Sequence, residues 1–220
     1  DLKNFDVIIL STGIKPRKPK INGVDHSKVM SYLDVLKHKK EIGGKVAIIG
    51  AGGIGFDVAE YITHQGKSSS LDVAAFLKEW GIDGMGEARG GIEGIESMHP
   101  KSPREVFLMQ RKESRVGAKL GKTTGWIHRA TLKNKKVNMI NGVQYDKIDD
   151  DGLHYTRKEK KHILEVDNIV LCAGQLSKNI LKEPLESIGK EVHLIGGAFL
   201  ASELDAKRAI KQGAVLAAKI

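Results

Sequence analysis

One stretch of this chain decides its fold: Lys45-Val46-Ala47-Ile48-Ile49-Gly50-Ala51-Gly52-Gly53-Ile54-Gly55. The apolar and β-branched residues before the first glycine are typical of a parallel strand that is covered on both faces. After the last glycine, apolar residues recur at helical spacing up to Gly66. Strand, glycine loop and helix are therefore contiguous, and they predict an α/β domain with a Rossmann-like parallel sheet.

The glycines of this loop have separate roles in a dinucleotide-binding domain. Gly50 would permit the tight turn, Gly52 would let the backbone approach a pyrophosphate, and Gly55 would let the helix pack closely on the strand. The amide groups at the helix start, including those of Gly53 and Ile54, would then face the phosphate oxygens. Because glycines also mark ordinary turns, the flanking strand and helix are what favour the dinucleotide site.

A basic segment follows the second predicted strand. NAD enzymes commonly place an acidic residue at this strand end, whereas NADP enzymes present positive charge to the 2′-phosphate. Here Gln110 is followed by Arg111 and Lys112, and we expect these residues to bind NADPH, with Arg115 as a third candidate. The alternative is that they are solvated surface charges. Their distance from Gly55 exceeds the usual twenty or so residues, which an insertion would explain.

Further elements are predicted on either side of this core. Strands are expected over residues 5–10, 105–110, 167–174 and 192–197, with a β-meander over residues 137–166. Helices are expected over residues 123–133 and 201–220, and a short one from Ser31, with Asp34 as its capping partner. The insertion, residues 64–103, predicts an amphipathic helix capped by Ser69 and then a flexible, lid-like or disordered glycine-rich stretch.

The bulk composition fits a folded protein with an anionic partner. The chain has 220 residues, 40% of them apolar, and a net charge of +9. Both NADPH and nucleic acid carry phosphates that would meet this charge, so a basic nucleic-acid binder is an alternative. Aromatic residues make up only 5% of the chain, which argues against base-stacking surfaces, and we expect no nucleic-acid partner.

The single cysteine, Cys172, excludes a disulfide framework and a cysteine-based metal or iron–sulfur site within this chain. It fits a reducing cytoplasm, and its apolar surroundings predict a small buried side chain rather than a nucleophile. No apolar run is long enough to span a membrane, and the first residues lack a secretory apolar region. The absence of an initiator Met before an immediate strand predicts a piece of a longer protein.

Two other sequence patterns give weaker indications of a functional site. Gly121-Lys122-Thr123 resembles a phosphate-binding P-loop, but that motif needs a glycine where Val116 stands. The segment more simply opens a helix near Thr124, whose start could face phosphate or nicotinamide. The eight histidines do not cluster at metal-ligand spacing, so no metal site is expected, and His128 has the best claim among them to a role.

Four stretches resemble the C-terminal part of the bacterial NADPH-dependent 2,4-dienoyl-CoA reductases: residues 46–57, 110–112, 121–129 and 195–197. The resemblance runs along essentially the whole chain, and residues 121–129 are its most specific part. It implies that residues 41–174 form an NADPH-binding domain, which positions NADPH for hydride transfer to FAD in fatty-acid β-oxidation. Residues 1–40 and 175–220 would form a partial FAD-binding domain, while FMN and a [4Fe–4S] cluster would lie in the rest of the same polypeptide.

The resemblance also implies roles for turns outside the glycine loop. Thr12, Gly13 and Gly197 would lie on the flavin side, and Ala173-Gly174 would pass beneath the nucleotide as a strand end. The FAD-binding Gly-x-Gly-x-x-Gly is absent, and Ala198 stands where such proteins often carry an acidic residue for the ribityl chain. The implied FAD site is therefore partial, and this piece alone is not expected to reduce a dienoyl-CoA.

Two further functions stay open. One is an NADH:flavin oxidoreductase that acts on another enoate or on an amine, because the substrate pocket would lie outside this chain. The other is a non-catalytic module that keeps an ADP-like ligand for structure. The basic residues after the second predicted strand favour a catalytic role.

Overall fold

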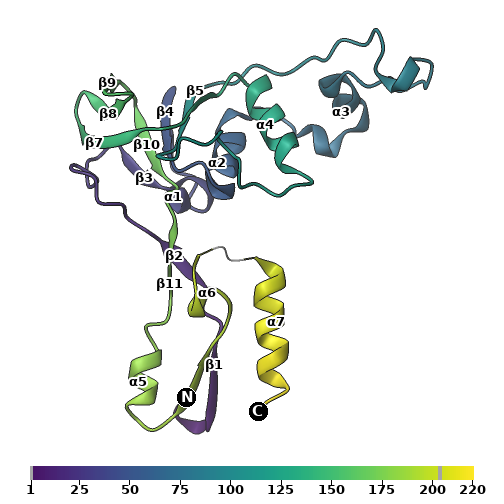
Figure 1. Ribbon diagram of the computed structural model, residues 1–220. Helices are drawn as coiled ribbons and strands as arrows, with labels where there is room; N and C mark the ends of the chain where they lie inside the picture. The colour runs from purple at the N-terminus through teal and green to yellow at the C-terminus, as the bar shows by residue number, and fades with distance from the viewer. Residues whose placement is uncertain (1, 203–204) are drawn as a thin grey trace. The chain divides into compact units, whose positions relative to one another are not determined.

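The computed structural model describes residues 2–202 and 205–220 (Figure 1). The chain divides into two compact units, a smaller one of Asp1–Lys18 with Ala173–Ile220 and a larger one of Pro19–Cys172. The sequence places the first boundary near residue 40, but the structure assigns residues 19–40 to the larger unit. The reason is that strand β3 (Val29–Ser31) pairs with β10 (Asn168–Leu171) inside the larger unit's sheet.

The larger unit is built on a five-stranded parallel sheet with the order β3-β10-β4-β5-β6. Its other strands are β4 (Lys45–Ile49), β5 (Glu105–Met109) and β6 (Asn138–Ile140). Ile49 lies opposite Met109 on one side and Leu171 on the other, so these strands end at the same edge. The chain order reverses beside β4, and such a switch point is where ligands bind in open α/β sheets.

Helices α1 (Tyr32–Leu36), α2 (Gly53–Thr63) and α4 (Gly125–Asn134) contribute to the core of this sheet. The side chains of β4 from Val46 to Ile49 are at most 1% exposed, which confirms the prediction of a strand covered on both faces. Phe56 and Val58 of α2 pack in the same apolar cluster as Val46. This packing fixes the start of α2 at the carboxyl end of β4.

The predicted meander begins later than the sequence indicated. Residues 138–140 form β6, an edge strand of the parallel sheet, and the strands that follow it in the meander are antiparallel. The meander consists of β7 (Gln144–Asp149), β8 (Gly152–Arg157) and β9 (Lys160–Leu164). Gly142, with a φ of 65°, lies in the turn that connects β6 to β7. This turn divides residues 137–148, which the alternating sequence pattern predicted as one part of the meander, between two sheets.

The insertion after α2 contains α3 (Val73–Trp80) and the 3₁₀ turns η2 (Ser69–Leu71) and η3 (Arg89–Gly91). Asp72, not Ser69, caps α3, because its carboxylate accepts a hydrogen bond from the Ala75 amide at 3.0 Å. The stretch expected to be flexible or disordered folds around Asp83, whose carboxylate accepts bonds from three backbone amides, those of Met85, Glu87 and Ala88. The Asp83 amide in turn donates to the Gly91 carbonyl at 2.8 Å.

The smaller unit pairs β1 (Val7–Leu10) with β12 (Glu191–Leu194) in parallel and β2 (Ile14–Pro16) with β11 (Gln175–Ser177) in antiparallel. It also contains η1 (Leu2–Asn4), α5 (Lys182–Glu186), α6 (Gly196–Phe199) and α7 (Ala206–Ala217). Its small core is formed by Ile8, Leu10 and Leu185. None of the helices in the described part of the chain has the length and apolar character of a bilayer-crossing segment.

Candidate functional site

The glycine loop lies between the end of β4 and the start of α2. Gly50 has a φ of 112°, a conformation that strongly favours glycine, and its amide donates to the Met109 carbonyl at 2.9 Å. The loop is thereby tied to the end of β5. A methyl group added to Gly55 would lie 1.9 Å from the Gly50 carbonyl oxygen, so the turn and the helix can meet only without a side chain at position 55.

The other two glycines of the loop border open space. A methyl group added to Gly52 or Gly53 would meet no atom within 4 Å, and both residues are exposed. Gly52 is the N-cap of α2 and provides no side-chain bond to the first amides of the helix. These features fit the pyrophosphate of a dinucleotide, because the backbone amides and the positive end of the helix dipole remain open to an anion.

The loop after β5 is held in shape by its own polar groups. The Gln110 side-chain amide donates to the Ser114 carbonyl at 2.6 Å, and the Lys112 carbonyl accepts from the Gly142 amide at 3.0 Å. The Asn141 side-chain amide donates to the Glu113 carbonyl at 2.6 Å. Gln110, a predicted cofactor ligand, therefore shapes this loop, a role that the sequence pattern had not indicated.

Arg111 and Lys112 are exposed, and neither forms an ion pair with a carboxylate among the residues that the structure describes. They directly follow the strand that is bonded to the glycine loop, which is where a 2′-phosphate would lie. Burial raises the pKa of the Tyr145 phenol, and the positive charge of the nearby Arg111 guanidinium partly opposes that rise. The positive charge after β5 is therefore available to an anionic ligand.

The glycine-threonine segment before α4 opens that helix, as the sequence predicted. Thr124 is the N-cap, with no side-chain capping bond, and the helix begins at Gly125. His128, on the first turns of α4, brings its Nδ1 within 2.6 Å of Glu60 Oε1 on α2. This pair links the two helices, and it gives His128 a structural partner rather than a ligand.

The predicted flavin-side turns of the smaller unit follow two paired strands. The Leu10 carbonyl at the end of β1 accepts a bond from the Ile195 amide at the end of β12, so Thr12 and Gly197 follow neighbouring strand ends. A cavity of about 370 Å³ lies there, lined by seven residues: Ser11, Ile195, Gly196, Gly197, Asp205, Ala206 and Ala209. A cavity of that size lies at the lower end of the range for small-molecule sites, and the flavin-side role of these turns stays a prediction.

Three of the other predicted positions in the smaller unit are held by hydrogen bonds to their backbone carbonyls or by a close side chain. Gly13 has a φ of 79° and its carbonyl accepts from the Lys178 amide at 3.0 Å. The Ala173 carbonyl accepts from Arg17 Nε at 2.8 Å, and a methyl group on Gly174 would lie 3.2 Å from the same nitrogen. The role of Ala173-Gly174 beneath a nucleotide stays a prediction.

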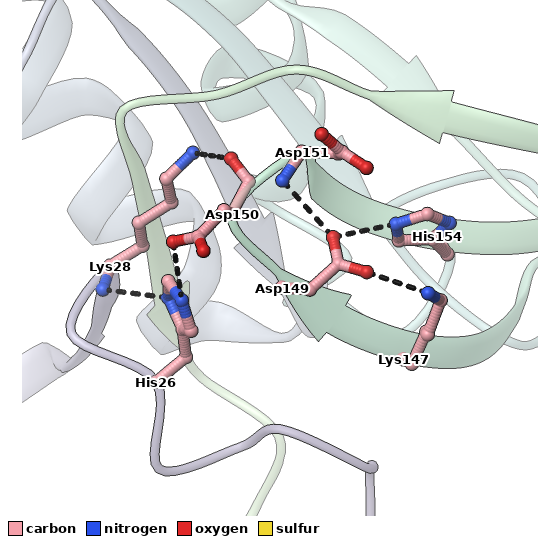
Figure 2. A network of polar contacts seen from close by, with 7 residues as sticks. All are labelled: His26, Lys28, Lys147, Asp149, Asp150, Asp151 and His154. Atoms are coloured by element: carbon pink, nitrogen blue, oxygen red, sulfur yellow. Dashed lines mark hydrogen bonds and ion pairs between the residues drawn. The ribbon is translucent and has the colours of Figure 1, made fainter.

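A polar network surrounds the β7–β8 turn of the larger unit (Figure 2). Asp149 accepts hydrogen bonds from Lys147 Nζ at 2.6 Å and from His154 Nε2 at 2.7 Å, and these two groups, Lys147 the more strongly, lower its pKa to about 2. Asp150 contacts His26 and accepts from Lys28 Nζ through its carbonyl at 2.6 Å. The network joins the hairpin to the loop before β3.

Asp149, Asp151 and His154 place three potential metal ligand atoms within 4.8 Å of one another. In this cluster Lys147 already provides positive charge to the Asp149 carboxylate, and the Asp151 amide donates to the same carboxylate at 3.1 Å. The short contacts of Asp149 are therefore explained by hydrogen bonds within the hairpin, without a metal ion.

Cys172 is 8% exposed at the end of β10, and its amide donates to the Ile49 carbonyl at 2.8 Å. Burial, together with the nearby Asp57 carboxylate, raises the pKa of the thiol to about 12. The side chain belongs to the main apolar cluster. These observations confirm the prediction of a small buried residue without nucleophilic character.

Comparison with protein families identifies this architecture. Residues 3–206 match the model of the pyridine nucleotide-disulphide oxidoreductases. The chain belongs to this family. Its members are flavoprotein oxidoreductases that bind FAD and NAD(P)H, which agrees with the open glycine loop. Since the chain has one cysteine, a redox-active disulfide cannot form within it.

Several named proteins are similar to this chain. Cinnamate reductase from Clostridium sporogenes is 26% identical over 200 residues, which are 90% of this chain and 24% of that protein. A structure of 2-naphthoyl-CoA reductase with 2-naphthoyl-CoA matches with a TM-score of 0.70 and 24% identity, over 94% of this chain and 26% of that one. The 6-hydroxypseudooxynicotine amine oxidase from Pseudomonas geniculata matches with a TM-score of 0.65 and 17% identity, over 90% and 27%.

These matches confirm the predicted α/β fold with a parallel sheet and an oxidoreductase role at the level of the family. The chain spans about a quarter of the length of these relatives. They bear out the expected kinship with flavin reductases, while the narrower resemblance to 2,4-dienoyl-CoA reductases stays a prediction.

Proposed function

We propose that the larger unit is the NADPH-binding domain of a flavin-dependent reductase and that the smaller unit is part of its FAD-binding domain. The observation that carries this proposal is the contrast within the glycine loop, where Gly55 is closed against Gly50 while Gly52 and Gly53 are open. An ordinary turn needs no such open backbone at a helix start. When bound, NADPH would supply a hydride, and the chain's own residues would bind and orient it.

The choice of NADPH over NADH rests on the loop after β5. Arg111 and Lys112 are exposed and without carboxylate partners in the described structure, and no acidic residue stands between them and the strand. The guanidinium of Arg111 can bind a phosphate through two parallel hydrogen bonds. Thr124, at the open end of α4, is a further candidate for contact with the coenzyme.

The proposal that the smaller unit is a partial FAD domain is supported by its small, incomplete parallel sheet. Parallel sheets are normally covered on both faces and have more than two strands. Among the residues that the structure describes, β1 pairs only with β12, and Val7 and Ile9 of β1 are 37% and 42% exposed. We propose that a segment outside this chain completes the sheet and, with Thr12, Gly13 and Gly197, the FAD site.

The substrate proposal is a conjugated enoyl thioester or enoate. The sequence resemblance favours 2,4-dienoyl-CoA, with FMN and a [4Fe–4S] cluster in the remainder of the polypeptide. The names of two relatives, cinnamate reductase and 2-naphthoyl-CoA reductase, support reduction of a conjugated carboxylate or its CoA ester. An amine substrate is the second candidate, and the amine oxidase with the same fold is the observation that favours it.

The test is a calorimetric titration of the chain with NADPH and, separately, with NADH, which measures the Kd for each coenzyme. We expect binding of one dinucleotide per chain with a preference for NADPH. Equal affinity for the two coenzymes would overturn the assignment of Arg111 and Lys112. Absence of binding by either coenzyme would favour the module that keeps only an ADP-like ligand, provided that ADP binds.

A further inference from the structure

A groove of the larger unit lies along β6, to the side of the glycine loop. It measures about 820 Å³, within the range of small-molecule sites in proteins. Nine residues from the loop after β5, from α4 and from β6 line it: Arg115, Val116, Arg129, Lys133, Lys136, Val137, Asn138, Met139 and Asn141. Since β6 is two strands from β4 in the sheet, the groove lies about 10 Å to the side of the glycine loop.

The charge on this groove has one sign. Four of its lining residues are cations, Arg115, Arg129, Lys133 and Lys136, and none is a carboxylate. In the described part of the chain, no carboxylate forms an ion pair with any of the four. Arg129 is held by a bond from Nη1 to the Gly117 carbonyl at 3.0 Å. Converging like charges repel, and an anion in the groove would relieve that repulsion.

Helix electrostatics account for only part of this arrangement. Lys133 lies in the last turn of α4, where the helix dipole favours a cation, and Lys136 follows it. Arg115, which the sequence also named as a candidate for the 2′-phosphate, comes from a different segment, the loop after β5, and it lines this groove rather than the glycine loop. The four charges therefore come from two segments, the loop after β5 and α4 with the residues directly after it.

The floor of the groove is apolar. Val116 and Val137 are 4% and 8% exposed, and Met139 packs against the main apolar cluster. An aromatic base can lie on such a surface, and a methionine sulfur contacts aromatic rings favourably. The Asn138 side chain at the edge offers an amide, which suits the polar edge of adenine. A floor for a base beside cations for phosphate matches a nucleotide better than an inorganic anion.

We propose that the groove along β6 binds a phosphorylated nucleotide at a site separate from the coenzyme of the glycine loop. The shared chemistry of its ligands is a ribonucleotide that carries a phosphomonoester. Such a group could come from a free nucleotide or from the nucleotide end of a CoA ester. The proposal does not rest on NADPH being the coenzyme of this chain.

The test is calorimetric titration of the chain with 3′,5′-ADP, in the absence and presence of saturating NADPH. The double variant Lys133→Gln, Lys136→Gln removes two exposed charges, and the control Lys160→Gln, Lys161→Gln removes two exposed charges from β9. We expect the first variant to weaken binding at least about tenfold and the control to change it less than about twofold. Lys133→Glu alone gives a second test, with a larger expected loss than Lys133→Gln.

Three outcomes would overturn the proposal. They are unchanged affinity in both groove variants, displacement of 3′,5′-ADP by NADPH, and binding of inorganic phosphate as tight as that of 3′,5′-ADP. A parallel titration with coenzyme A in place of 3′,5′-ADP distinguishes the two sources of the ligand. Equal or tighter binding of coenzyme A supports the CoA end, and weaker binding supports a free nucleotide.

Discussion

The carbonyl oxygen of Gly50 lies only 1.9 Å from the position that a Cβ atom on Gly55 would take. Replacing Gly55 with Ala must therefore separate α2 from β4 or distort the turn between them. We expect Gly55→Ala to lower the free energy of unfolding by at least about 2 kcal/mol, as measured by urea denaturation. Gly53→Ala adds the same methyl group to open space and should change that free energy by less than about 1 kcal/mol. Equal effects of the two variants would contradict this reading of the loop.

Gly52 offers the complementary experiment, because it faces open space in the free chain. We expect Gly52→Ala to leave stability nearly unchanged, apart from a small N-cap effect of at most about 1 kcal/mol. A dinucleotide pyrophosphate would meet the added methyl group, so the Kd for NADPH should rise at least about tenfold. This corresponds to a loss of about 1.4 kcal/mol of binding free energy. Calorimetry on the folded variant checks this, and wild-type affinity would show that the pyrophosphate lies elsewhere.

Arg111 is expected to determine coenzyme preference rather than binding as such. Loss of its charge-assisted contact in Arg111→Ala should reduce the preference for NADPH over NADH by about 1–3 kcal/mol, with little change in the Kd for NADH. Arg89→Ala removes an equal charge from η3 of the insertion and serves as the control. An equal loss of affinity for both coenzymes would mean that Arg111 acts on the pyrophosphate or on the fold.

Local sequence was sufficient for the elements whose causes are local. The strand at Lys45–Ile49 has its predicted bounds, because β-branched residues end directly at a glycine turn. The helix predicted from Ser31 has its full capping box: the Asp34 amide donates to Ser31 Oγ at 3.2 Å, and the Ser31 amide donates to the Asp34 carboxylate at 2.9 Å. Both features depend on residues fewer than six positions apart.

The features that the sequence did not reveal depend on distant partners. β6 has only three residues, and it is a parallel strand solely because Phe107 to Met109 lie beside it. The basic groove likewise draws Arg115 and Lys136 together from segments separated by the whole of α4. The order in residues 81–94 comes from one carboxylate, Asp83, that accepts several backbone amides, and composition alone reads those glycines as flexible.

Cys172 provides a probe of local opening at the end of β10. Its pKa of about 12, against an ordinary value of 9.0, leaves a thiolate fraction on the order of a thousandfold lower near pH 8, and burial limits access further. We expect iodoacetamide to label the native chain at least about a hundredfold more slowly than the urea-unfolded chain. Mass spectrometry of quenched samples measures both rates. Rapid labelling of the native chain would show that the strand end opens readily.

The acid stability of the larger unit should depend on Asp149. Its folded pKa of about 2 lies below the usual value near 3.9, because Lys147 and His154 bond to the charged carboxylate. A depressed folded pKa means that the stabilisation is present above pH 4 and is lost as the pH falls from about 4 to about 2. Asp149→Asn lacks this contribution at every pH. The free energy of unfolding of the wild type should therefore exceed that of Asp149→Asn at pH 5, and the excess should shrink towards pH 2.

Urea titrations at a series of pH values measure that excess directly. Asp34, whose pKa also falls to about 2, is present in both proteins, so its contribution cancels in the difference. Asp151→Asn removes the same charge two residues away without removing a bond to His154 or Lys147, and it is the matched control. If the difference between wild type and Asp149→Asn stays constant down to pH 2, the short contacts in Figure 2 do not favour the ionised carboxylate over its protonated form. If Asp151→Asn behaves like Asp149→Asn, the effect belongs to the net charge of the hairpin and not to those two bonds.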